Sequence, residues 1–259
     1  MPTANRHGPE LQLSNISNPY YDGSMNVIFD HSEPTATNIR TFWFKPEKTV
    51  HYTAGQFTEM YLNHDNADER GIRRWFTLSS SPTDGMVSIT TKFAAEHGST
   101  FKQTLASLKP GAPLHLAEPM GDFVLPKDPS IPLVFIAGGI GVTPMHSMIK
   151  YLHDTHQKRT IRLIYAVATL DELAFEPLFK EYGVTLIPVV KTAPAGYQGE
   201  TGSLDAPRIL SLLGGDDGRS LYYISGPEGM VEAFTAGLKA QGVDKRRLVG
   251  DYFPGYQRF

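Results

Sequence analysis

Cysteine is absent from this 259-residue sequence. Without cysteine, the chain can form no disulfide, no cysteine-ligated iron–sulfur cluster, no thiolate zinc site and no cysteine nucleophile. An excess of positive charge is also missing, because 24 Lys and Arg residues stand against 27 Asp and Glu residues and the net charge is −3. This balance does not favour phosphate backbones or anionic lipids, so we expect no nucleic-acid partner.

Long hydrophobic runs are missing as well. The most apolar segment, IPLVFIAGGIGV at residues 131–142, is too short to span a membrane. Residues 1–24 lack the basic start and apolar core of a signal peptide, and we expect them to form a flexible lead-in. These absences predict a cytoplasmic protein with no membrane span. Among nine histidines, the pair His153 and His156 suits a helix end better than a zinc site, so we expect no metal.

The first half of the sequence is rich in short β-type segments divided by turn residues. They lie at residues 25–30, 39–44, 57–62, 75–80, 86–93 and 113–118. Only one helix is predicted among them, at residues 98–108. Six closely spaced strands with one helix are typical of a small antiparallel β-barrel.

The second half alternates strand-like and helix-like segments. Strands are predicted at 131–137, 161–167, 184–190, 221–227 and 246–253, and helices at 143–154, 171–182, 206–213 and 229–242. Such alternation predicts a parallel sheet covered on both faces, as in Rossmann-like α/β domains. The two halves meet in the proline-rich segment LPKDPSIP, residues 125–132. We therefore expect a flexible segment at 1–24, a barrel domain at 25–127 and an α/β domain at 128–259.

A glycine-rich turn in the second half has the features of a phosphate site. In FIAGGIGVTPMHSMIKYL, residues 135–152, an apolar strand leads into Gly139 and Gly141, and Thr143 and Pro144 are predicted as the N-cap and first residue of a helix. Glycines allow close approach and the free N–H groups of a helix start favour an anion, so we expect a pyrophosphate here. An ordinary tight turn would show the same residues, and the spacing differs from G-x-G-x-x-G.

A second turn of this kind, Ser225, Gly226 and Pro227, follows a later predicted strand. In an open parallel sheet, ligands bind beyond the carboxyl ends of the strands, and both turns are predicted to lie at that edge. Their coincidence favours a nucleotide site over two unrelated turns.

The segment RRWFTLSSSP, residues 73–82, places cations ahead of alternating bulky and hydroxyl side chains. In a strand, Arg74 and Phe76 share one face, whereas Trp75 and Thr77 share the other. A solvent-facing strand end would by itself explain a single arginine.

A helix start close behind that strand favours a second phosphate site. In HGSTFKQTLASL, Gly98 and Ser99 precede the helix, and Thr100 and Gln103 are predicted to form a capping box. An arginine that reaches a phosphate bound here would make charge-assisted hydrogen bonds of about 1.5–3 kcal/mol each. Two phosphate sites, one in each half, predict two nucleotides and electron transfer between them.

In their order and spacing, these motifs resemble those of the ferredoxin–NADP reductase superfamily from Val27 to Tyr256. The similar segments are AGQF at 54–57, RWFT at 74–77, GSTFKQTL at 98–105, MGDFVLP at 120–126, AGGIGVTP at 137–144, SGP at 225–227 and DYFPGY at 251–256. The resemblance implies an antiparallel β-barrel domain that binds flavin, followed by an α/β parallel-sheet domain that binds NAD(P).

The resemblance also implies a role for each motif residue. The flavin-binding residues would be Arg74, Trp75, Phe76 and Thr77, with Gly98, Ser99 and Thr100 at its phosphates and Phe253 or Tyr256 over its ring. The pyridine nucleotide would be bound by Gly139, Gly141, Thr143, Gly226 and Pro227. The residues nearest to hydride transfer would be Thr77, Ser225 and Asp251.

The implied activity is hydride transfer between NADPH or NADH and bound FAD, rather than FMN, with electrons passed to an external acceptor such as a ferredoxin or flavodoxin. Phe76 replaces the usual Tyr and Ser225 the frequent Cys. Ala168 lies near where relatives often carry a polar residue for the 2′-phosphate, a role that Lys191, Arg208 or Arg159 could take. These departures also allow a non-catalytic flavin-binding redox module or a partner-docking subunit.

Overall fold

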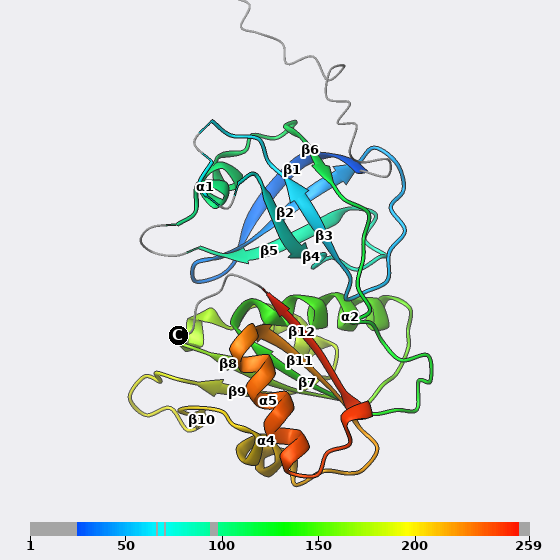
Figure 1. Cartoon of the computed structure of the whole chain (residues 1–259), viewed down its shortest axis with the longest axis vertical. Coiled ribbons are helices and arrows are strands. Elements are labelled where there is room, and N and C mark those ends of the chain that lie inside the picture. The colour runs from blue at the N-terminus through cyan, green and yellow to red at the C-terminus, as the bar shows by residue number, and fades with distance from the viewer. Residues whose placement is uncertain (1–24, 66, 70, 94–97, 254–259) are drawn as a thin grey trace, which may run out of the picture.

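The computed structural model of the chain describes residues 25–65, 67–69, 71–93 and 98–253. The predicted lead-in at 1–24 and the candidate residue Tyr256 lie outside the described residues, as does the side chain of Phe253. The described chain forms two six-stranded sheets, one above the other in Figure 1.

The first sheet is antiparallel and barrel-like, with strand order β4-β3-β6-β1-β2-β5. Its elements are β1 (Met25–Ala36), β2 (Ile39–Pro46), β3 (Phe57–Tyr61), β4 (Arg73–Thr77), β5 (Val87–Lys92), helix α1 (Thr100–Ser107) and β6 (Pro113–Leu116). Alternation of apolar and polar residues turns one side of each strand inward, where Phe42, Phe44 and Phe101 are fully buried. The antiparallel barrel predicted from the first half is confirmed.

The second sheet is parallel, with strand order β10-β9-β8-β7-β11-β12. Its strands are β7 (Leu133–Gly138), β8 (Ile161–Val167), β9 (Thr185–Val190), β10 (Glu200–Thr201), β11 (Leu221–Pro227) and β12 (Leu248–Phe253). Its helices are α2 (Thr143–Asp154), α3 (Glu176–Glu181), α4 (Ala206–Leu213) and α5 (Glu228–Ala240), with short 3-10 turns η2 (Gly139–Val142), η3 (Leu170–Glu172) and η4 (Lys245–Arg247).

Helices cover both faces of the parallel sheet. Helices α2 and α3 pack on one face, where Met145, Met148 and Phe179 are fully buried, and α4 and α5 pack on the other. Two buried faces explain why the central strands are apolar along their whole length. Helix α2 also lies along the junction with the barrel (Figure 1).

The helix predicted over residues 171–182 is wrong in length. The structure has a 3-10 turn at Leu170–Glu172 and helix α3 only at Glu176–Glu181. Phe175 separates them with a left-handed backbone, at φ 64° and ψ 8°, which a continuous right-handed helix cannot contain. The short strand β10 was not predicted, because two residues carry no recognisable alternation.

Candidate functional site

The two glycine-rich turns of the α/β domain meet at the carboxyl end of its sheet. An added Cβ at Gly141 would lie 2.2 Å from the carbonyl oxygen of Ser225, so only glycine allows this approach of β11 to the turn after β7. Gly139 has φ +51° and open space where a side chain would project. Both turns therefore present bare backbone at one edge of the sheet, as a phosphate site requires.

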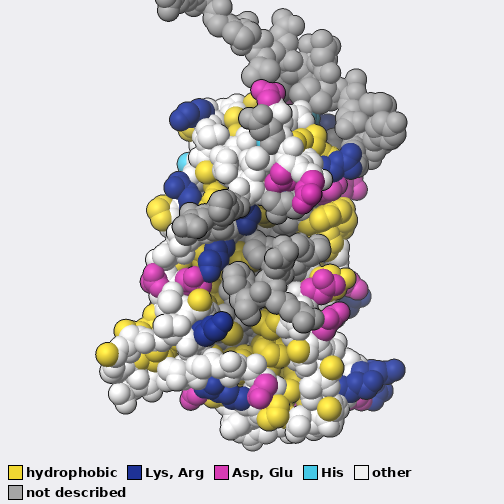
Figure 2. Space-filling view, turned by 60° about the vertical axis from the view of Figure 1, so that its left-hand side comes forward, with side chains coloured by type: hydrophobic (Ala, Val, Ile, Leu, Met, Phe, Trp, Pro, Cys, Tyr) yellow, Lys and Arg dark blue, Asp and Glu magenta, His cyan; other side chains and the backbone are white. Residues whose placement is uncertain are grey.

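A cavity of about 380 Å³ opens beside these turns. Its lining comes mainly from the ends of β7, β8, β9 and β11 and includes Gly139, Ala168, Lys191, Gly226 and Pro227. Figure 2 shows apolar side chains gathered on this part of the α/β domain, with Lys and Arg side chains near its border. The volume and the mixed lining suit part of an extended nucleotide.

The predicted N-cap at Thr143 is wrong. Thr143 is already within helix α2, Val142 is the N-cap residue, and the Thr143 hydroxyl donates to the Ile140 carbonyl at 3.0 Å. The 3-10 turn at Gly139–Val142 runs directly into the helix and moves the cap one residue earlier. The first turn of α2 still begins at the glycine turn.

The three cations considered for a 2′-phosphate have different surroundings. Lys191 is exposed and lines the cavity. The Arg208 guanidinium donates to the carbonyl oxygens of Thr201 and Ser203 and to the Glu200 carboxylate, at 2.6–2.9 Å. The Arg159 guanidinium donates to the carbonyl oxygens of residues 126 and 128, before β7, at the opposite end of the strand from the cavity. Lys191 is therefore the best placed of the three.

A cation of the barrel, Lys92, also lines this cavity of the α/β domain. The Lys92 ammonium at the end of β5 forms an ion pair of 2.5 Å with Glu172, and both side chains lie in the cavity wall. The two residues are 80 positions apart, so no local pattern could have joined them. The pair connects the two domains at the mouth of the candidate nucleotide site.

A second, apolar pocket of about 230 Å³ lies where β4 of the barrel meets β12. It is lined by Phe57, Trp75, Phe76, Thr77, Met120, Asp251 and Tyr252. Trp75 and Tyr252 are 44% and 51% exposed, which is unusual for large rings, whereas Phe76 is buried and contacts Phe101 in the barrel. The pocket thus joins predicted flavin residues to the C-terminal strand across the domain boundary.

Two hydroxyl groups have no hydrogen-bond partner among the described residues: one belongs to Thr77, which lines this pocket, and the other to Ser225, which is paired in register with the pocket residue Asp251. They are the buried Oγ1 of Thr77 and Oγ of Ser225, one from each domain. A buried hydroxyl without a partner carries a desolvation penalty of about 1–3 kcal/mol. Because both belong to the predicted hydride-transfer residues, they fit a bound group that supplies the missing contacts.

Asp251 is placed opposite Ser225 by the parallel register of β11 and β12. Burial raises the pKa of Asp251 to about 6, and the nearby Asp122 carboxylate adds to the rise. The carboxyl therefore holds a proton at a higher pH than an ordinary aspartate. A carboxyl with a pKa near neutrality beside a pocket is a candidate proton donor.

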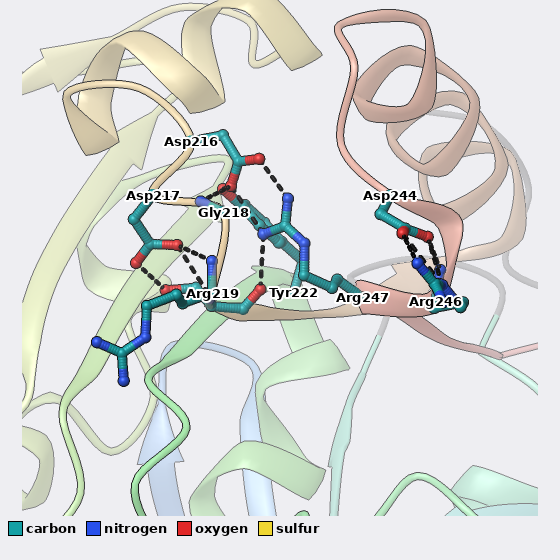
Figure 3. Close-up of polar contacts among 9 residues, drawn as sticks. Asp216, Asp217, Gly218, Arg219, Tyr222, Asp244, Arg246 and Arg247 are labelled. Carbon is teal, nitrogen blue, oxygen red and sulfur yellow. Dashed lines mark hydrogen bonds and ion pairs between the residues drawn. The ribbon is translucent and has the colours of Figure 1, made fainter.

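An ion network fixes the start of β12 and with it the position of Asp251. The Arg247 guanidinium donates to both carboxylate oxygens of Asp216, and the Tyr222 hydroxyl donates to the same carboxylate at 3.0 Å (Figure 3). The Arg247 guanidinium also lies 5.7 Å from the centre of the Tyr222 ring. These contacts lie at the amino ends of β11 and β12, remote from the pocket, so their role is structural.

Arg74 lies beside the start of helix α1, as predicted. Its guanidinium is 5.1 Å from the centre of the Phe101 ring, forms a 3.0 Å ion pair with Asp68 and donates to the Gly71 carbonyl. The carboxylate of Asp68 thus already neutralises part of the charge on Arg74. This ion pair gives one of the acidic residues in the connection between β3 and β4 a structural role.

The predicted capping box at Thr100 and Gln103 is wrong. Ser99 is the N-cap residue and its hydroxyl accepts from the Lys102 N–H at 3.2 Å, whereas the Gln103 amide donates to the Gly98 carbonyl. The Thr100 hydroxyl instead accepts from the Asp68 N–H at 3.1 Å and contacts His64. The cap therefore lies one residue earlier than the sequence suggested.

No cluster of three or more His, Asp or Glu side chains suited to a metal occurs among the described residues. His153 stacks on Tyr182 with ring centres 4.2 Å apart. Within the same described part of the chain, every helix is too short or too polar to cross a membrane.

Residues 135–236 match the family model described as the oxidoreductase NAD-binding domain. The chain is 25% identical over 232 residues to a flavohemoprotein of Bacillus cereus, covering 83% of this chain and 57% of that protein. It is 27% identical over 218 residues to the glycine betaine monooxygenase reductase subunit of Chromohalobacter salexigens, covering 80% and 58%. The chain thus spans less than two thirds of either relative.

Solved structures share the whole two-domain arrangement. A ferredoxin NADP⁺ reductase of Neisseria gonorrhoeae with bound FAD and NADP superposes with a TM-score of 0.74 at 18% identity, covering 90% of this chain and 99% of that one. The FAD/NAD-binding domain of nitric oxide dioxygenase from Vibrio cholerae gives 0.76 at 21% identity, with the same coverage. The predicted two-domain fold is confirmed, and the predicted resemblance to the ferredoxin–NADP reductase superfamily holds at the level of this fold.

Proposed function

We propose that this chain, which has the fold of the ferredoxin–NADP reductase superfamily, is an NAD(P)H-dependent flavoprotein reductase. It would bind FAD and pass electrons to an acceptor outside the described residues. One observation carries the proposal: the apolar pocket between the domains brings Thr77 and Asp251 together, beside a glycine-lined cavity. In this proposal, the boundary between the flavin-binding domain and the nucleotide-binding domain lies within residues 125–132, between the two sheets.

FAD is the proposed flavin, because solved structures with a similar fold have FAD in their titles, which favours it over FMN. Arg74 and the start of α1 at Ser99 would hold its phosphates, because the Arg74 guanidinium lies over the ring of Phe101 in the first turn of α1, where helix N–H groups are free. Trp75 and Phe76 would contact its ring from β4. The bound flavin supplies the redox chemistry, accepting a hydride and releasing electrons.

The pyridine nucleotide would occupy the cavity at the carboxyl end of the parallel sheet. The backbone at Gly139 and Gly141 and the first turn of α2 at Thr143 would bind its pyrophosphate. Gly226 and Pro227 also line the cavity and would lie next to the bound pyrophosphate. The nicotinamide end would then extend toward Ser225, at the boundary with the barrel.

Three side chains of this chain would act at the reacting ends of the two cofactors. The partnerless hydroxyls of Thr77 and Ser225 would donate to polar ring atoms and orient the rings. The Asp251 carboxyl, with its pKa raised to about 6 by burial first and Asp122 second, would hold a proton near the pocket. A dry pocket strengthens each of these interactions.

The electron acceptor would be external, because the cysteine-free sequence cannot bind an iron–sulfur cluster through thiolates. A ferredoxin or flavodoxin is one candidate class. The matched flavohemoprotein and monooxygenase reductase subunit suggest a haem protein or an oxygenase component as others. The exposed rings of Trp75 and Tyr252 lie at the pocket where such an acceptor would receive electrons.

Anaerobic stopped-flow mixing of the FAD-loaded protein with NADH, and separately with NADPH, tests the proposal. We expect rapid loss of the visible flavin absorbance with at least one nucleotide. Thr77→Val, which removes only the hydroxyl, should retain FAD but be reduced more slowly. Failure to bind FAD would refute the proposal, and FAD binding without reduction by either nucleotide would indicate a non-catalytic flavin module.

A further inference from the structure

Helix α2 links the candidate nucleotide site to the candidate flavin strand. Its first turn, at Thr143, follows the glycine turn that lines the nucleotide cavity. One turn later, His146 and Ser147 face the barrel and contact the segment that continues β4 beyond Thr77. The helix therefore connects the two sites directly.

The contacts between α2 and this segment are made by two buried side chains and two backbone carbonyls. His146 Nδ1 lies 2.8 Å from the Ser79 carbonyl oxygen, and Ser147 Oγ donates to the Ser80 carbonyl oxygen at 2.5 Å. All four residues are at most 7% exposed. Because a carbonyl oxygen only accepts, the proton of neutral His146 is on Nδ1.

The histidine is held in this role by its surroundings. Its ring stacks on Phe175 with centres 3.8 Å apart and planes inclined by 20°. Burial is the main cause that lowers the pKa of His146 to about 4, so the ring is neutral near pH 7. A neutral ring with its proton fixed on Nδ1 donates a single hydrogen bond in one direction. Such a bond can hold the two domains in one relative position.

The serine segment that receives these contacts is itself rigid. Ser79 Oγ bonds to Ser88 Oγ at 2.9 Å, and Ser80 Oγ accepts from the Ser88 N–H and contacts the Tyr52 hydroxyl, both at 2.8 Å. The consecutive serines after β4 thus use their side chains within the barrel. The Ser79 carbonyl accepts from His146, and the Ser80 carbonyl accepts from Ser147 and also from the Tyr52 hydroxyl at 3.0 Å. The Ser81 carbonyl accepts from the Asp84 N–H within the barrel.

A further contact continues the same interface along α2. Lys150 forms ion pairs with Asp84 of the barrel at 3.1 Å and with Asp154 of its own helix at 2.5 Å. These side chains are more exposed than His146 and Ser147, so water screens them more strongly. Fine alignment of the two domains therefore depends mainly on the buried pair.

We propose that His146 and Ser147 are positioning residues that set the spacing between nicotinamide and flavin by docking helix α2 on residues 79 and 80. The proposal rests on the proposed reductase function. Ser79 is two residues beyond Thr77, and His146 is one helical turn beyond Thr143, so a shift at this contact moves one cofactor site against the other. A misplacement of about 1 Å can lower a reaction rate about 100-fold.

His146→Leu and His146→Asn separate this role from general packing. Leucine keeps the site apolar but leaves the Ser79 carbonyl without its donor, whereas asparagine restores an N–H near the Nδ1 position. Ser147→Ala tests the second contact should the leucine variant fail to fold. His153→Leu is the matched control, because this histidine is on the same helix but is 46% exposed at its side chain.

Stopped-flow flavin reduction at saturating nucleotide should be about 10- to 100-fold slower in His146→Leu, with nucleotide Kd and FAD content changed less than about twofold. His146→Asn should regain most of the rate, Ser147→Ala should slow it, and His153→Leu should match the wild type. Hydrogen exchange of the backbone amides of residues 79–81 should be faster in His146→Leu, even without nucleotide.

Equal reduction rates in wild type and His146→Leu, or an asparagine variant as slow as the leucine variant, would overturn the positioning role. So would a leucine effect confined to nucleotide Kd, or unchanged exchange at the amides of residues 79–81. If His146→Leu fails to fold, a wild-type rate in Ser147→Ala overturns it. A wild type that nucleotide does not reduce would instead refute the proposed reductase.

Discussion

Gly141 offers the sharpest test of how closely the two glycine-rich turns of the α/β domain approach each other. In Gly141→Ala, the new Cβ would lie 2.2 Å from the Ser225 carbonyl oxygen and 2.7 Å from the Gly226 Cα. Both neighbours are backbone, so β11 must move by about 1 Å to reach the ordinary contact distance of 3.4 Å. Overpacking of this kind costs about 1–3 kcal/mol of folding free energy.

The same shift would move Ser225 away from the pocket, which predicts a reduction rate about 100-fold lower. FAD content should stay unchanged, because the barrel residues are untouched. The assay combines urea unfolding with stopped-flow flavin reduction. Gly139→Ala is the comparison, because it meets no atom within 4 Å and adds only the strain of a left-handed residue at φ +51°.

An alanine at position 141 that leaves both stability and reduction rate at wild-type values would refute the close approach of the two turns. Equal damage from alanine at 139 and at 141 would show that glycine flexibility, and not the contact with Ser225, is what the site needs.

Three other substitutions test individual side chains. Arg74→Ala should weaken FAD binding about 10- to 100-fold, because one charge-assisted hydrogen bond contributes about 1.5–3 kcal/mol; FAD titration followed by fluorescence measures this, and an unchanged Kd contradicts it. Lys191→Ala should raise the KM for NADPH at least about 10-fold while changing the KM for NADH little, if Lys191 meets the 2′-phosphate; steady-state assays with both nucleotides decide, and equal effects exclude the role. Asp251→Asn should alter the pH dependence of unfolding of the FAD-free protein. The Asp251 pKa is raised from 3.8 to about 6, so its contribution to stability is fully present below pH 3.8 and is lost as pH rises through about 6. The free energy of unfolding of the wild type should therefore fall by about 2–3 kcal/mol more than that of the asparagine variant over this range. Parallel pH curves for the two proteins would rule out the buried, proton-retaining carboxyl.

The strands and most helices could be predicted because their patterns are local. The apolar face of residues 143–154 gave helix α2 with the predicted bounds, and its methionines are buried as expected. The predicted helix at 171–182 failed at Phe175, whose left-handed backbone depends on packing against the rest of the domain. Cap residues were each misplaced by one position, because a turn and a helix start share the same sequence signals.

The candidate site was predictable where one motif holds both the backbone and the chemistry. The turns at Gly139, Gly141 and Ser225 could be placed at one edge of the sheet from the sequence, because turns that follow parallel strands lie at the carboxyl ends of those strands. The Arg74 contact with Asp68 and the Lys92 contact with Glu172 could not be identified, because the first depends on how the connection before β4 folds back on the strand and the second joins two domains.

By itself, the sequence determined the two sheets, the glycine turns and the exclusion of thiolate chemistry, since periodicity, backbone freedom and side-chain type act over a few residues. Only the tertiary structure decided what the serines at 79–81 do, where Asp251 acquires its raised pKa and which cation enters the nucleotide cavity. These properties arise from burial and from contacts between distant segments, and neither exists until the two domains have packed together.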